Sequence, residues 1–169
     1  MNTPDPAIVL GVLSSILAYA WPLWATNIAL NGLSFLKRWD RPLDGGHMLF
    51  DGKPIFGAST TWLGLALALA LGALFVAAFP AQPLIFWKAV SAYCGHALGC
   101  FIKRRIGAQP GSYVPFIVHA DYVLFFGALS AALGGFEPAL FGWTLAVTVI
   151  CTPAVTLLAH RLEMRAAPV

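Results

Sequence analysis

Residues 61–79 read TWLGLALALALGALFVAAF, a stretch without a charged side chain that is followed by Pro80 and Pro83. A helix needs about 20 mostly apolar residues to cross the hydrocarbon core of a membrane, and this stretch reaches that length. Proline cannot continue a helix, because its ring clashes with the preceding turn. The stretch therefore predicts a membrane-spanning helix that ends before the prolines.

Four further apolar stretches predict spans of the same kind, at residues 8–25, 84–102, 116–133 and 140–158. The whole chain of 169 residues is 59% hydrophobic and 10% charged, whereas an ordinary soluble domain is about 25% charged. This composition excludes a soluble globule and a disordered chain. The sequence predicts one all-α integral membrane domain over residues 1–169, with five transmembrane helices.

The basic residues predict the orientation of these helices. Of the ten Lys and Arg residues, nine fall in residues 26–60, in residues 103–105 or in the tail after residue 158. Under the positive-inside rule these segments are cytoplasmic, which places the N-terminus outside and the C-terminus in the cytoplasm. The tenth, Lys88, is expected to extend its ammonium toward the outer side. Since topology accounts for the basic residues, we expect membrane lipids and no nucleic acid as partners.

The first cytoplasmic segment, at about residues 26–60, carries the first set of candidate site residues. Residues 42–62 read PLDGGHMLFDGKPIFGASTTW. The carboxylates of Asp44 and Asp51 could hold a divalent cation, and Lys53 could bind a phosphate. The alternative is a glycine-rich connecting loop whose charges are solvated.

The third predicted span and the second cytoplasmic segment, at about residues 103–115, carry the other set. Residues 95–105 read GHALGCFIKRR. On a helix His96, Gly99 and Lys103 share one face, and Gly95 with Gly99 forms a pair of small residues that suits close helix contact. The basic triplet at residues 103–105 is typical of a topology signal or of contact with anionic lipid headgroups.

Asp121 lies inside the fourth predicted span. A carboxylate is unfavourable there and usually has a function. The structural alternative is an ion pair with a neighbouring arginine.

These motifs together resemble the CDP-archaeol synthases. The resemblance rests on Asn27, then PLDGG, DGKPIFG and a Thr-Trp pair, followed by GxxxGxFIKRR and an Asp-Tyr-Val run that opens the next span. It implies a five-helix membrane enzyme that transfers a cytidylyl group from CTP to a lipid phosphate, uses Mg²⁺ and releases pyrophosphate.

The resemblance also implies roles for individual residues. The implied catalytic residues are Asp121, Lys103 and Asp44. Implied to bind substrate are Asn27, Asp51, Lys53, Thr61, Lys103, Arg104 and Arg105. The implied metal ligands are Asp121 and Asp44, with His96 as a doubtful third.

The sequence departs from the family at four positions. Ala58 and Thr60 stand where the family has Asp and Lys, and His96 and Val118 stand where it has Asp. Hard cations prefer oxygen ligands, so His96 is a poor magnesium ligand. These departures leave open a catalytically degenerate member that binds a nucleotide or lipid headgroup or acts as a partner subunit. A small transporter and a homodimer also remain open.

Overall fold

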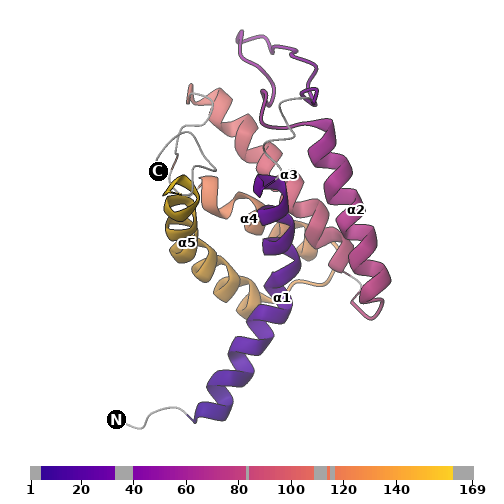
Figure 1. The fold of residues 1–169 in the computed structure, drawn as a ribbon, viewed down its shortest axis with the longest axis vertical. Helices are drawn as coiled ribbons and strands as arrows, with labels where there is room; N and C mark the ends of the chain where they lie inside the picture. Colours follow the sequence, from indigo (N-terminus) through magenta and orange to yellow (C-terminus); the bar gives the residue numbers. More distant parts are fainter. Residues whose placement is uncertain (1–4, 33–39, 83, 109–113, 115–116, 162–169) are drawn as a thin grey trace.

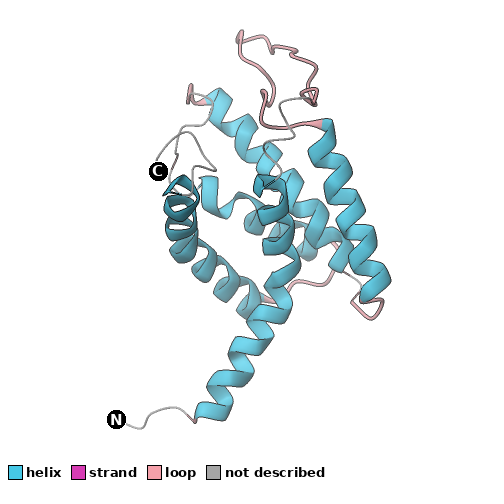
Figure 2. Ribbon diagram, in the orientation of Figure 1, coloured by secondary structure: helices cyan, strands magenta, loops and turns pink. Residues whose placement is uncertain are grey.

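The computed structural model describes residues 5–32, 40–82, 84–108, 114 and 117–161, with the backbone alone for 117–119 and 154–161. In these residues the chain forms five helices and no strand: α1 (Pro6–Gly32), α2 (Trp62–Ala78), α3 (Ile85–Arg105), α4 (Ile117–Ala132) and α5 (Pro138–Arg161) (Figures 1 and 2). The predicted all-helical fold with five helices is confirmed.

Helix α3 is the centre of the bundle, because it packs against α1, α2 and α4, while α5 packs against α1 and α4. The loop 40–61 and the C-terminal end of α3 lie at one end of the bundle, and the α2–α3 and α4–α5 connections lie at the other (Figure 1). The two basic segments that were expected on one side of the membrane therefore share one end of the bundle.

Two helices of the described chain, α1 and α3, are long and apolar enough to cross a membrane, and the other three have shorter apolar runs. The outward faces of α1 and α2 are apolar, with Leu10, Leu17, Leu69 and Leu74 exposed. Such surfaces fit lipid better than water.

The contact between α3 and α4 is close, as the small residues of α3 predicted. A Cβ added at Gly95 would lie 2.3 Å from the Cα of Tyr122, and one at Gly99 would lie 2.5 Å from Oδ2 of Asp121. At Gly95 glycine thus lets the two backbones meet, and at Gly99 it makes room for the carboxylate of Asp121.

The structure extends α1 seven residues beyond the predicted end at residue 25, so that Asn27 lies in a helix and not in the loop. The side-chain amide of Asn31 donates to the backbone carbonyl of Asn27 at 2.8 Å. This contact, one helical turn along, satisfies the polar side chain of Asn31 in a stretch that was predicted to be a loop.

The expectation for Lys88 is wrong. Its side chain is buried inside the bundle, with Nζ 4.4 Å from the centre of the Tyr19 ring and 5.7 Å from that of Phe126. An ammonium is attracted to the faces of aromatic rings, and this attraction holds Lys88 inward.

Replacement of Gly95 by alanine tests the close helix contact. The new methyl group would collide with the α4 backbone, so Gly95→Ala should lower the free energy of unfolding by about 1–3 kcal/mol. Gly142→Ala is the matched control, because nothing lies within 4 Å of its added Cβ. The control should leave the melting temperature in detergent unchanged or raise it. Equal effects of the two variants would contradict the packing.

Candidate functional site

Asp44 organises the loop 40–61 from within. Its side chain is 8% exposed, and its two oxygens accept hydrogen bonds from the backbone amides of Gly46 (3.0 Å), Phe56 (2.9 Å) and Gly57 (2.8 Å). Burial raises the pKa of this carboxyl, but the three backbone hydrogen bonds outweigh burial, so its pKa lies below the ordinary value. Asp44 thus stays ionised and ties together two arms of the loop.

Arg105 fastens the same loop to the end of α3. Its guanidinium pairs with Asp51 at 2.8 Å and donates to the backbone carbonyls of Lys53 and Pro54. In return, Nζ of Lys53 donates to the carbonyl oxygen of Arg105 at 3.1 Å. The planar fork of arginine suits this set of acceptors, so three residues that were predicted to bind substrate hold the loop in place.

Thr61 marks the point where the loop becomes α2. Its Oγ1 accepts a hydrogen bond from the amide of Gly64 at 3.2 Å, which makes it the N-cap of the helix. Its carbonyl oxygen accepts a hydrogen bond from the hydroxyl of Tyr93 on α3 at 2.6 Å. This buried residue therefore links the loop to α2 and α3.

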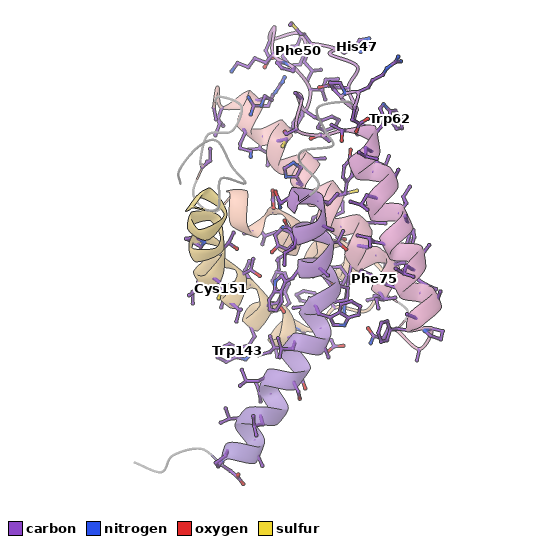
Figure 3. The ribbon with its side chains drawn as sticks, viewed as in Figure 1. His47, Phe50, Trp62, Phe75, Trp143 and Cys151 are labelled. Carbon is purple, nitrogen blue, oxygen red and sulfur yellow. The ribbon has the colours of Figure 1, made fainter. Side chains whose placement is uncertain are left out.

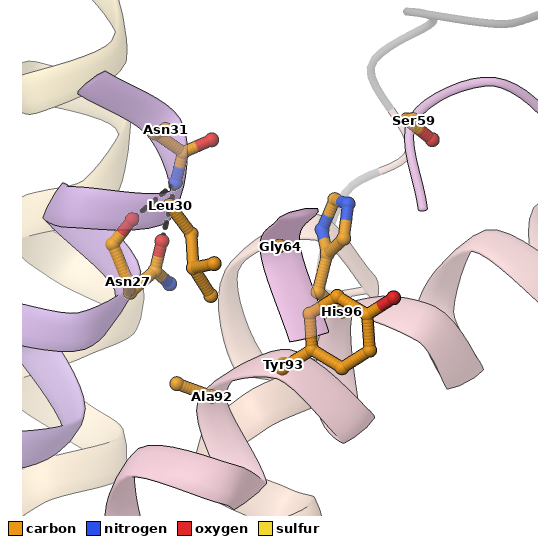
Figure 4. A pocket seen from close by; sticks show the side chains of 8 residues that line it. All are labelled: Asn27, Leu30, Asn31, Ser59, Gly64, Ala92, Tyr93 and His96. Atoms are coloured by element: carbon orange, nitrogen blue, oxygen red, sulfur yellow. Dashed lines mark hydrogen bonds between the residues drawn. The ribbon is translucent and has the colours of Figure 1, made fainter. Parts of the chain in front are cut away.

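A small pocket, a hollow that opens to solvent, lies below the loop, between α1, α2 and α3 (Figure 4). Its polar lining consists of amide, hydroxyl and imidazole groups. The lining residues are Asn27, Leu30, Asn31, Ser59, Gly64, Ala92, Tyr93 and His96. In Figure 4, Asn27 and Asn31 of α1 lie across the pocket from Tyr93 and His96 of α3, with Ser59 of the loop on the far side of the imidazole.

The carboxylate of Asp121 lies beside this pocket, against Gly99 on α3. Its electrostatic neighbours include His96, one turn before Gly99, and Lys103, one turn after it. His96 also contacts Cys100, whose Sγ lies 3.5 Å from Nε2 of the imidazole and 3.2 Å from Oγ of Ser59. The predicted shared face of α3 is thus the face that meets Asp121.

The structure brings some predicted site residues together and separates others. Asn27 lines the pocket. Lys103 lies on the α3 face that carries the pocket-lining His96, and it is an electrostatic neighbour of Asp121. Five other predicted residues have contacts that order the loop, and their substrate roles stay predictions: Asp44, Asp51, Lys53, Thr61 and Arg105.

Arg104 is buried under the loop beside Gly57, while Val118 lies where only the backbone is described. The tip of the loop, with His47 and Phe50, points away from the bundle (Figure 3).

Three residues around the pocket were missed by the sequence analysis. Asn31 lies one turn after Asn27, Tyr93 lies three residues before His96, and Cys100 lies four residues after it. Each spacing places the residue on the same helix face as a recognised one. Helical spacing could have identified Tyr93 and Cys100, because a helix was predicted there. It could not have identified Asn31, because the first helix was predicted to end at residue 25.

The Mg²⁺ that the resemblance implies does not fit the described donors as a resident ion. Asp44 is used by three backbone amides and Asp51 by Arg105, which leaves Asp121 between a lysine and a histidine. Within the described residues, no group of three His, Cys, Asp or Glu side chains could hold a metal ion. A hard cation needs more oxygen ligands than this arrangement offers.

No protein-family model matches the chain. Curated relatives do: it is 34% identical to the CDP-archaeol synthase of Hyperthermus butylicus over 83% of this chain and 84% of that protein. It is 30% identical to the CDP-archaeol synthase of Halobacterium salinarum over 88% and 92% of the two chains. A solved structure of an intramembrane enzyme for archaeal membrane lipid biosynthesis matches 82% of this chain with a TM-score of 0.63 and 26% identity, and 93% of that chain is covered.

Identity of this extent over most of both chains shows the family. The chain belongs to the CDP-archaeol synthase family, as the motifs of the two basic segments predicted.

Replacement of Asp44 by asparagine tests its role in the loop. The side-chain NH₂ of asparagine would face an amide donor, so Asp44→Asn should destabilise the loop by about 1–3 kcal/mol. Asp51→Asn breaks a partly exposed ion pair and should cost less than about 1 kcal/mol. Hydrogen exchange of the Phe56 and Gly57 amides is the measurement.

The same amides should respond to pH. Folding lowers the pKa of Asp44, so its contribution to the stability of the loop is complete above the unfolded-state pKa of about 3.9. That stability is lost as pH falls through the lower pKa of the folded state. If the hydrogen-exchange protection of the Phe56 and Gly57 amides changes neither with the two substitutions nor with acid, Asp44 does not organise the loop.

Proposed function

We propose that this chain transfers a cytidylyl group from CTP to the phosphate of a membrane lipid and releases pyrophosphate. The observation that carries the proposal is the similarity to CDP-archaeol synthases over more than four fifths of the chain. The geometry supports it, because a hollow whose lining includes amide, hydroxyl and imidazole groups opens at the basic, loop-bearing end of the bundle. A phosphate in the headgroup layer could reach such a position.

The reaction joins two anions and needs nearby positive charge. An oxygen of the lipid phosphate attacks the α-phosphorus of CTP, one P–O bond forms, and the bond to the β-phosphate breaks with its electron pair on pyrophosphate. Attack requires that the two phosphates be held in line against their repulsion. Lys103 follows the pocket-lining His96 on the same face of α3, and we assign this role to it, with the buried Arg104 next in the chain under the loop.

The pocket itself suits the uncharged part of a substrate. The amides of Asn27 and Asn31 and the hydroxyl of Ser59 can exchange hydrogen bonds, and the ring of Tyr93 forms an apolar wall. Asp121 contributes as an electrostatic neighbour of Lys103 and His96.

The chain is proposed to sit in the membrane with all five helices spanning, the N-terminus outside and the pocket open to the cytoplasm. Nine basic residues on one side support this orientation. The helix ends support it as well, because both basic segments lie at one end of the bundle. A homodimer is compatible with the exposed apolar faces of α1 and α2.

The second candidate is a relative that binds CTP or a lipid headgroup without turnover. The specific observation in its favour is that Asp44 and Asp51, two of the carboxylates that the resemblance assigns to the site, are already committed to the loop.

One assay separates the two candidates. Purified protein in detergent, with labelled CTP, Mg²⁺ and a panel of lipid phosphates, should form CDP-lipid and pyrophosphate in equal amounts. Lys103→Met should lower kcat/KM by about tenfold or more, since a charge-assisted contact to phosphate is lost. Arg41→Met removes an exposed charge from the same end and is the control. CTP binding without CDP-lipid from any lipid would favour the binding protein.

Cysteine labelling tests the orientation. In a background without the native cysteines, Ala81→Cys should react with an impermeant thiol reagent added to whole cells, because the α2–α3 connection is expected outside. Gln109→Cys should react only after the cells are opened. The reverse pattern would contradict the proposed topology.

A further inference from the structure

Each acidic residue at the loop-bearing end of the described chain already has a partner. Asp40 accepts a hydrogen bond from the amide of Leu63 at 2.7 Å. Asp44 accepts three backbone hydrogen bonds, and Asp51 pairs with Arg105. These three carboxylates order the loop, and a divalent cation would have to break their contacts to use them.

The remaining carboxylate, that of Asp121, stands between two basic side chains. His96 and Lys103 lie one turn to either side of Gly99, against which the carboxylate rests. The single carboxylate of this cluster is offset by the ammonium of Lys103. One carboxylate beside a cation is a poor site for a divalent cation, whereas an ammonium and an imidazole can both donate hydrogen bonds to an anion.

We infer that this chain holds no resident divalent cation and that His96 and Lys103 form a receptor for a phosphate group. The inference deepens the proposed function and rests on it for the choice of ligand, a phosphate of a nucleotide or of a lipid. His96 lines the pocket, and its contact with Cys100 braces the imidazole on one side. Asp121 is the positioning residue, because its carboxylate rests against Gly99, one helix turn from each of the two basic residues.

The first experiment measures metal binding without substrate. Mn²⁺ takes the same oxygen ligands as Mg²⁺ and is visible by electron paramagnetic resonance. Nucleotide-free wild-type protein should show no stoichiometric bound Mn²⁺. His96→Asp places a second carboxylate beside Asp121 and should create a site, whereas His47→Asp, the same exchange at the loop tip, should not. Stoichiometric Mn²⁺ on the wild type would overturn the inference, even if neither variant folds.

The second experiment measures phosphate binding in EDTA and in excess Mg²⁺, with CTP, pyrophosphate and phosphatidic acid as separate probes. At least one of these probes should bind the wild type with the same Kd in EDTA and in Mg²⁺. The probe that binds shows whether the phosphate comes from a nucleotide or from a lipid. His96→Gln should weaken that probe by about tenfold in both conditions, because it removes one charge-assisted contact. His47→Gln, the same exchange at the loop tip, should not.

Binding that disappears in EDTA, or binding that His96→Gln leaves intact, would overturn the inference. These results are independent of turnover. Metal-free phosphate binding without CDP-lipid formation would contradict the proposed transfer reaction and leave the receptor standing.

Discussion

The close contact between α3 and α4 is the constraint on which the site depends. Gly95 lets the α4 backbone approach to a distance that any side chain would prevent, and Gly99 leaves room for the side chain of Asp121. This contact seats the carboxylate of Asp121 on α3, between His96 and Lys103. In a membrane, where apolar surfaces have no solvent-driven reason to associate, such small-residue packing is the main means of fixing one helix against another. Backbone packing thus sets the charge arrangement beside the pocket.

The loop 40–61 completes the pocket and depends on the same end of α3. Asp44 closes the loop on itself, and Arg105 holds it to the helix. As a result Ser59 reaches Cys100, which in turn contacts His96. Ser59, from a segment whose sequence is typical of a solvated connection, therefore contributes to the pocket lining. The carboxylates that hold this loop are engaged in those contacts.

Much of the fold could be predicted from the sequence, because five apolar stretches and the spacing of Gly95 and Gly99 are local signals. The shared face of His96 and Lys103 followed from helical periodicity in the same way. The extension of α1 through Asn27 could not be predicted, since Asn31 satisfies Asn27 only once the helix has formed. Lys88 points inward because rings from α1 and α4 attract it, and the structural roles of Asp44 and Thr61 depend on amides that only the folded loop brings near. Such contacts join distant residues and leave no pattern in a single sequence.

The resemblance to CDP-archaeol synthases extends over most of the chain. It implies a basic residue at position 60 and an acidic residue at position 96, where this chain has Thr60 and His96. Lys103, on the same α3 face as His96, is the cation that we assign to the phosphate. A structure of the protein with the phosphate probe that binds it, CTP, pyrophosphate or phosphatidic acid, determined in the presence of EDTA, tests this arrangement most directly. It should show the phosphate against Lys103 and His96, beside the pocket lined by Asn27 and Tyr93. A phosphate bound elsewhere on the bundle, or bound only after metal is added, would contradict it.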